Sequence, residues 1–85
     1  MNDQTKPTTI GALLRVARER RALTQRDAAA ALYVSKVTYS RWECGKSIPD
    51  MRYRTRLAGF AGVSLADVGD ACIAGVAARR EVADG

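Results

Sequence analysis

The sequence predicts an all-α fold, a single compact domain of five helices. Three observations support this: apolar residues recur at spacings of three and four, capping residues precede the apolar stretches, and no segment alternates as a strand does. With 85 residues, the chain forms one small domain. Such a domain buries only about 60–65% of its unfolded surface, so its stability is marginal.

The first two predicted helices lie close together in the sequence. Thr8 or Thr9 can cap a helix that ends near residues 21–22, and its inner face consists of Ile10, Leu13, Leu14 and Ala17. The second helix starts at Thr24, which forms a capping box with Asp27, and runs through Leu32. Alanines at positions 28–31 are small enough to allow a close approach by the next helix.

A third helix follows a turn at residues 33–34. Ser35 can cap it, and Gly45 lies just beyond its expected end near Glu43. The second and third helices therefore have the arrangement of a helix-turn-helix over residues 24–43. In that arrangement the later helix lies in the major groove of DNA and reads base edges with its N-terminal residues.

Two more helices are predicted in the C-terminal half. Pro49 ends a loop from residue 46, and Asp50 can cap a helix over residues 51–61 that Gly62 terminates. Ser64 forms a second capping box with Asp67 and opens a fifth helix that extends to residue 79 or 80. We expect residues 1–7 to form a flexible arm, residues 8–80 the domain, and residues 81–85 a frayed tail.

The net charge of +5 is unevenly distributed. Residues 1–56 contain twelve Lys and Arg against five Asp and Glu, whereas residues 57–85 contain two against four. A basic region around the helix-turn-helix fits a phosphate backbone as partner. A solvated basic face that keeps a small protein soluble explains the charge equally well.

The chain contains no histidine and two cysteines, Cys44 and Cys72. The commonest general base and most zinc ligand sets are therefore missing, and the sequence has no glycine-rich phosphate loop. We expect no enzyme activity, no metal and no cofactor. Two cysteines are too few for a disulfide framework, and no signal peptide or apolar run of about 20 residues is present, which predicts a soluble cytoplasmic protein.

A set of motif residues points to a family. In order, these are Leu14, Arg18-Glu19, Leu23-Thr24-Gln25, Ala29, Val34-Ser35, Trp42-Glu43-x-Gly45, Pro49 and Val63-Ser64. The set spans roughly residues 8–68 and resembles the Cro/repressor helix-turn-helix family of phage and bacterial regulators. The resemblance implies a lambda-repressor-like domain that binds operator DNA as a dimer, with a structural ion pair between Arg18 and Glu43.

The sequence departs from the family pattern at Ala22 and Tyr33, where the family usually has glycine. We expect positive φ angles at both positions. Such a conformation costs a non-glycine residue about 1 kcal/mol or more, so strain or a slight reshaping of the turn is expected.

The predicted base-reading residues lie on the third helix: Ser35, Lys36, Val37 and Arg41. Lys36 and Arg41 can donate to guanine O6 and N7. They stand about 140° apart around the helix, so one can read a base while the other holds a phosphate. Val37 suits a thymine methyl group, or is simply an apolar surface residue. Ser35 serves first as the cap.

Phosphate contacts are predicted around this helix, from Thr24, Gln25, Thr38, Ser40, Lys46 and Arg52. Gln25 matches the glutamine that bonds the DNA backbone in the resembled family. Thr38 and Ser40 can bond phosphate or water, and Arg54 and Arg56 can equally well be solvated instead of binding phosphate. Tyr39 is expected in the core with its hydroxyl at the edge, and Trp42 is expected to pack over the first helix.

The fifth helix carries the predicted dimer interface, formed by Leu65, Val68, Cys72 and Val76. These residues are either core or a dimer seam, and a helix longer than the usual family end favours the seam. The chain is thus expected to be a sequence-specific DNA-binding regulator, a repressor that binds an inverted-repeat operator as a homodimer. The alternatives are an antitoxin-like module that binds a protein partner and a nonspecific architectural DNA-binding protein.

Overall fold

The computed structural model describes residues 8–84. These residues form five α-helices and no strand, which confirms the all-α prediction. The elements are α1 (Ile10–Arg20), α2 (Gln25–Ala31), α3 (Lys36–Cys44), the short 3-10 helix η1 (Met51–Tyr53), α4 (Arg54–Ala61) and α5 (Leu65–Asp84). The arm predicted at residues 1–7 lies outside the described residues.

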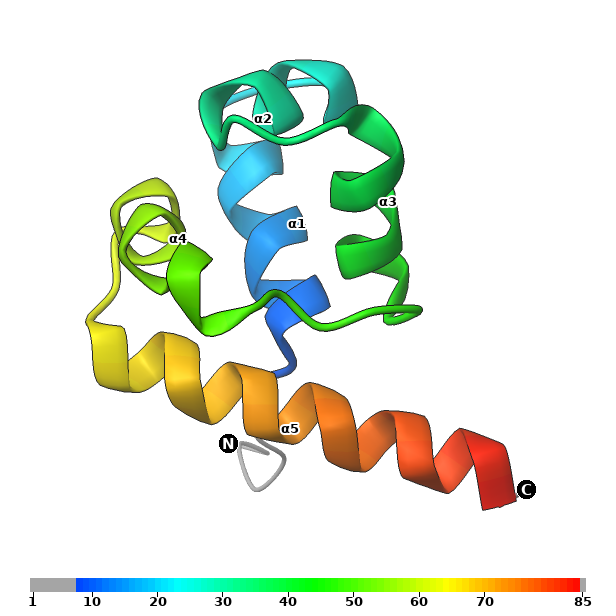
Figure 1. Ribbon diagram of the computed structural model, residues 1–85. Coiled ribbons are helices and arrows are strands. Elements are labelled where there is room, and N and C mark those ends of the chain that lie inside the picture. Colours follow the sequence, from blue (N-terminus) through cyan, green and yellow to red (C-terminus); the bar gives the residue numbers. More distant parts are fainter. Residues whose placement is uncertain (1–7, 85) are drawn as a thin grey trace.

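Helix α1 stands at the centre of the bundle (Figure 1). It contacts α3, α4 and α5, while α2 packs on α3 and α4 packs on α5. Helix α5 runs along the base of the molecule, and α3 stands at one edge, with one side against α1. The arrangement leaves the other side of α3 open to solvent.

The capping signals in the sequence set the helix starts as predicted. Thr9 accepts a hydrogen bond from the Ala12 backbone N–H, which fixes the start of α1. Thr24 and Asp27 form both bonds of the capping box at α2, and Ser35 caps α3. Helices α3 and α4 end at glycines with φ angles of 79° and 72°, in the left-handed region that glycine adopts freely.

Two helix boundaries differ from the prediction. The first turn of the expected helix over residues 51–61 is the 3-10 helix η1, because the Asp50 carboxylate accepts from the Arg52 N–H and the Asp50 carbonyl from the Tyr53 N–H. At the other end, α5 continues to Asp84, past the end that was predicted at residue 79 or 80. No glycine or proline interrupts residues 76–84, and alanine and arginine there favour the helix.

The expected positive φ angles are confirmed at 57° for Ala22 and 60° for Tyr33. Both residues follow a helix end that closes in the same way. The Leu23 N–H donates to the Arg18 carbonyl at 3.1 Å, and the Val34 N–H donates to the Ala29 carbonyl at 3.0 Å. These bonds satisfy carbonyls that the last turn leaves unpaired. These two hydrogen bonds hold the backbone in the turn conformation, although neither Ala22 nor Tyr33 is a glycine.

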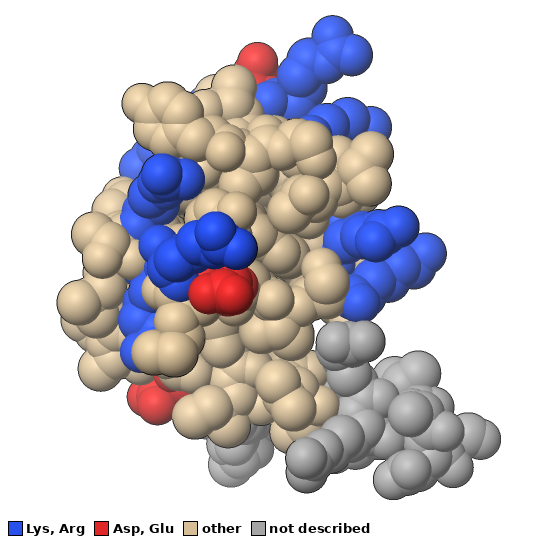
Figure 2. Space-filling view, in the orientation of Figure 1, with Lys and Arg blue, Asp and Glu red and all other residues tan. Residues whose placement is uncertain are grey.

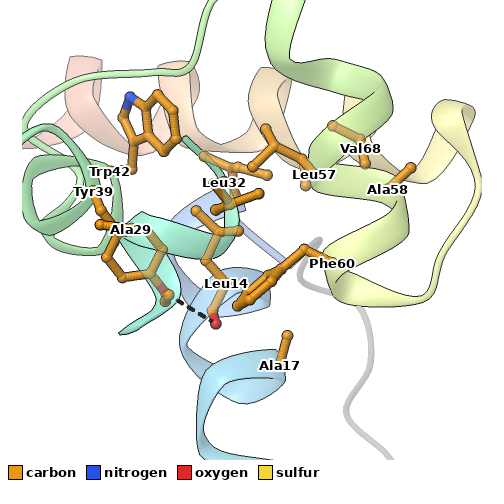
Figure 3. Close-up of a cluster of buried hydrophobic side chains, with 13 residues drawn as sticks. Leu14, Ala17, Ala29, Leu32, Tyr39, Trp42, Leu57, Ala58, Phe60 and Val68 are labelled. Atoms are coloured by element: carbon orange, nitrogen blue, oxygen red, sulfur yellow. Dashed lines mark hydrogen bonds between the residues drawn. The ribbon is translucent and has the colours of Figure 1, made fainter. Parts of the chain in front are cut away.

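The core lies between α1 and the surrounding helices (Figure 3). Its fully buried large side chains are Ile10, Leu14, Leu32, Tyr39, Leu57 and Val68. Trp42 is 3% exposed and meets the Tyr53 ring edge-on, with 5.2 Å between ring centroids. The core positions predicted for Tyr39 and Trp42 are confirmed. Each large buried side chain stabilises the fold by about 1.5–3 kcal/mol relative to its exposed state.

Among the described residues, no single helix is long and apolar enough to cross a membrane. Residues 51–61 and 65–78 reach the required length and hydropathy only together, across a bend of 113°. Both cysteines are free thiols. Within the described part of the chain, no three His, Cys, Asp or Glu residues are grouped so that they could hold a metal ion.

Candidate nucleic-acid interface

Helix α3 has a buried face and an open face. Tyr39, Trp42 and Glu43 are buried against the rest of the bundle, whereas the first turn and the opposite side are exposed. Val37 is 63% exposed. An apolar side chain is held in solvent there because the buried residues of α3 fix the rotation of the helix.

The open face of α3 gathers predicted contact residues into one shallow depression, here called the reading face: Lys36, Val37, Ser40, Arg41, Cys44 and Lys46. Figure 2 shows Lys and Arg side chains along the edge of the molecule that carries α3, on the right of the view, and a second group on the left. The structure brings together two of the predicted phosphate contacts and three of the predicted base contacts. Cys44 was not predicted here, although its spacing of seven from Val37 places it on the same side of the helix.

The hydroxyl residues near the starts of α2 and α3 act as caps. The Ser35 hydroxyl accepts from the Thr38 N–H at 3.1 Å and donates to the Thr38 hydroxyl oxygen at 3.0 Å. The Thr38 hydroxyl hydrogen is thus left free to donate to another acceptor. Thr24 is exposed, and its hydroxyl accepts from the Asp27 N–H at 3.1 Å.

A buried carboxylate joins the first three helices. Arg18 donates to Glu43 from Nε at 2.6 Å and from Nη2 at 3.2 Å, which confirms the predicted ion pair. The Tyr39 hydroxyl donates to Glu43 Oε2 at 2.5 Å. The Gln25 amide donates to Oε1 at 3.1 Å. Glu43 therefore ties the start of α2 and the last turn of α1 to the end of α3, which carries the reading face and is called the reading helix below.

Sequence reasoning missed two partners of Glu43. Tyr39 is 0% exposed, and its hydroxyl also lies 3.3 Å from the Leu14 carbonyl, so the hydroxyl is buried and the prediction that it reaches the edge is wrong. Its spacing of four from Glu43 on one helix was the available signal. Gln25 uses one amide hydrogen on Glu43, and the second can still donate to a phosphate.

The network fixes the charge states of its members. Burial by itself would raise the pKa of the Glu43 carboxyl, but hydrogen bonds from Arg18, Tyr39 and Gln25 outweigh burial and hold this pKa below its ordinary value of 4.5. The hydrogen bond to Glu43 raises the pKa of Arg18. Burial and the neighbouring carboxylate raise the pKa of Tyr39, so its hydroxyl remains a donor.

The lowered pKa of Glu43 predicts a loss of stability in acid. The stabilisation is fully present above the unfolded-state pKa of 4.5 and disappears as the pH falls through the lower folded-state pKa. Urea unfolding of the wild type and of Glu43→Gln, from about pH 7 to about pH 3, measures this effect. We expect the variant to be less stable at neutral pH, and we expect its free energy of unfolding to depend less on pH. Parallel pH curves for the two proteins would contradict the assignment.

Four basic residues lie between the end of α3 and the end of α4, in the loop, in η1 and in α4. Lys46 is exposed on the reading face, and Arg52 is exposed with its guanidinium 5.6 Å from the centre of the Tyr53 ring. Arg54 is half-buried against α5, where its guanidinium approaches Gly69. Arg56 donates to the Leu32 carbonyl at 3.3 Å. Arg54 and Arg56 therefore both have specific neighbours within the fold.

The apolar side of α5 differs in part from the predicted dimer interface. Val68 is 0% exposed and lies in the core beside α4, so its assignment to a dimer interface is wrong. Leu65 and Val76 are 50% and 40% exposed, and Ile73, which was not predicted, is 70% exposed. These three line an open depression with Cys72, whose burial raises the pKa of its thiol.

The fold and its open face define a class of protein. A helical bundle that holds two consecutive helices across a tight turn, with the second exposed and basic, is a helix-turn-helix domain. A family model described as a helix-turn-helix domain matches residues 9–71, and the chain belongs to this family. No curated protein and no solved structure matches the chain.

Proposed function

We propose that this protein is a sequence-specific DNA-binding transcriptional regulator of the Cro/repressor type. The observation that carries the proposal is the exposed reading face on the second helix of the helix-turn-helix. Lys36 and Arg41 offer donors suited to guanine, and the exposed Val37 offers a surface for a thymine methyl group. The buried side of α3 supports this role, since a helix fixed against a core presents its donors in a defined orientation.

Phosphate contacts then orient the domain on the duplex. Lys46 lies beside Arg41 on the reading face, and Arg52 is exposed just before α4. Gln25 and Thr38 each retain a free donor hydrogen, and Ser40 borders the same depression. Contacts of this kind release counterions and fix the register, while the base contacts provide specificity.

A homodimer that represses by occlusion completes the proposal. In a two-fold dimer, two α3 helices would enter successive major grooves about 34 Å apart and so block polymerase on an inverted repeat. The exposed apolar residues Leu65, Ile73 and Val76 support α5 as the dimer surface. Arg54 and Asp70 border the same depression, and neither forms an ion pair within the described residues. We place the protein in the cytoplasm, on the chromosomal DNA that it would regulate.

Selection from a pool of random duplexes tests the function. The regulator proposal predicts enrichment of one inverted repeat, whose binding weakens with added salt but stays specific. Binding without an enriched motif would instead indicate an architectural protein. Absence of binding at physiological salt, together with co-purification of a stoichiometric protein, would indicate the antitoxin-like alternative.

The dimer surface predicts the effect of a charge on α5. Ile73→Glu is expected to weaken self-association by about tenfold or more, because an unpaired carboxylate would be buried between the subunits. Sedimentation equilibrium measures the change. The matched control is Val16→Glu, which places the same charge on an exposed apolar residue of α1. Equal self-association of both variants and the wild type would exclude this face of α5 as the dimer surface.

A further inference from the structure

Tyr33 is a bulky residue at a position that favours glycine, and its surroundings explain how it is held there. Its φ angle is 60°, and the residue is 79% exposed. It lies in the turn that leads into α3, so a change of its backbone angles would change the direction in which α3 begins. A left-handed tyrosine costs about 1–2 kcal/mol, and this cost must be offset by contacts elsewhere.

Arg56, from α4, contacts this turn in two ways. Its Nη1 donates to the Leu32 carbonyl at 3.3 Å, an oxygen at the end of α2. Its guanidinium also lies 5.2 Å from the centre of the Tyr33 ring, within the range of a cation–π contact. One side chain therefore holds both the carbonyl before the strained residue and the ring of the strained residue.

A second aromatic ring links Arg56 to α3. Its guanidinium is 5.8 Å from the centre of the Tyr53 ring, and Tyr53 meets Trp42 of α3 edge-on at 5.2 Å. Tyr33 lies before the start of α3, whereas Trp42 lies near its end. Among the described residues, Arg56 forms no ion pair. Its guanidinium instead contacts two aromatic rings and a carbonyl.

We propose that Arg56 is a positioning residue of the reading helix, which it holds through Tyr33 at one end and through Tyr53 and Trp42 at the other. The Tyr33 ring, which a glycine would lack, provides the surface on which Arg56 stacks. Arg56 then controls discrimination between DNA sequences more than overall affinity. This role in discrimination rests on the proposed function, whereas the positioning itself is a property of the free protein.

Arg56→Lys tests the proposal because it keeps the charge but removes the planar group that stacks and caps. We expect the ratio of specific to nonspecific affinity to fall about fivefold, with an unchanged salt dependence of nonspecific binding. Tyr33→Ala keeps a non-glycine residue at the left-handed position and should also lower the ratio. The double variant should lose little more than Arg56→Lys, because both changes remove the contact between the guanidinium and the Tyr33 ring. Arg21→Lys is the matched control, since Arg21 stacks on Phe60 at 4.9 Å on another part of the bundle.

Amide hydrogen exchange of the free protein provides a readout that needs no DNA. In Arg56→Lys, the N–H groups of Tyr33 and Val34 should exchange about fivefold faster, as expected for the loss of one local contact. Those of Ala22 and Leu23, which close the end of α1 in the same way, should not change. A uniform increase at both helix ends would mean general destabilisation and would overturn the proposal.

The outcomes separate the two proposals. If the wild type discriminates between duplexes and Arg56→Lys discriminates equally well, Arg56 is not a positioning residue. If Arg56→Lys matches the wild type while Arg56→Gln lowers the salt slope by about one, Arg56 is a phosphate contact. If the wild type prefers no duplex, the proposed function fails, and the exchange rates at Tyr33 and Val34 still decide whether Arg56 holds the turn.

Discussion

Replacement of Glu43 by alanine is expected to lower the free energy of unfolding by about 3–5 kcal/mol, a large part of the total stability of a small domain. The Glu43 side chain is 2% exposed and accepts hydrogen bonds from three helices. Its removal leaves the partly buried Arg18 guanidinium without its carboxylate. The cost arises mainly from this uncompensated charge, and not from the net strength of the ion pair.

Without Glu43, Arg18 and Tyr39 each keep one carbonyl as a hydrogen-bond acceptor, which limits the predicted loss of stability. The Arg18 Nη1 still donates to the Leu23 carbonyl at 3.0 Å, and the Tyr39 hydroxyl still has the Leu14 carbonyl at 3.3 Å. Thermal and urea unfolding at neutral pH measure the change. The control is Glu19→Ala, which removes the same charge from an exposed residue of α1 and should stay within about 0.5 kcal/mol of the wild type. Equal stability of the two variants would show that the network does not stabilise the fold.

Replacement of Gly11 by alanine is expected to destabilise the protein, the opposite of the usual effect within a helix. A Cβ atom at Gly11 would lie 2.6 Å from the Glu43 carbonyl oxygen and 2.7 Å from that of Trp42. Both obstacles are backbone atoms of α3, which cannot turn aside as a side chain can. The overlap should cost about 1–3 kcal/mol beyond the helix propensity that alanine gains.

Gly59 is the matched control for Gly11. It lies within α4, and a Cβ atom there would meet nothing within 4 Å. Gly59→Ala should therefore stabilise the protein by about 0.5–1 kcal/mol, or roughly 4 °C in Tm, because alanine favours the helix. Differential scanning calorimetry of both variants tests the close approach of α1 to α3. A rise in Tm for Gly11→Ala would contradict it.

Local signals in the sequence predicted the helix starts and turns because the responsible residues are neighbours in the chain. Thr24 with Asp27, and Ser35, act within four residues of where they stand. The left-handed angle at Tyr33 was expected instead from the resemblance to a family that usually has glycine at this position. The length of α5 was underestimated because propensity changes little between residues 79 and 84, so the pattern contains no clear stop.

The contacts that position the reading face could not be predicted from spacing. Gln25 meets Glu43 across 18 positions, and Arg56 meets Leu32 across 24. Residues so far apart in the chain meet only when the helices pack. The same is true of the close approach of Gly11 to α3. Likewise, periodicity indicated an apolar side on α5, but only the packing of α4 shows that Val68 faces the core while Ile73 faces solvent.

A binding titration of reading-face variants tests the central claim most directly. Fluorescence anisotropy with the selected duplex compares the wild type, Lys36→Ala, Arg41→Ala and the control Arg20→Ala. Arg20 is exposed beside Ala61 and Val63, on the α4 side of α1. We predict that Lys36→Ala or Arg41→Ala weakens binding about tenfold or more and relaxes the preference at a particular base pair, while Arg20→Ala changes affinity little. Equal losses for all three variants, with the base preference intact, would contradict base reading by α3.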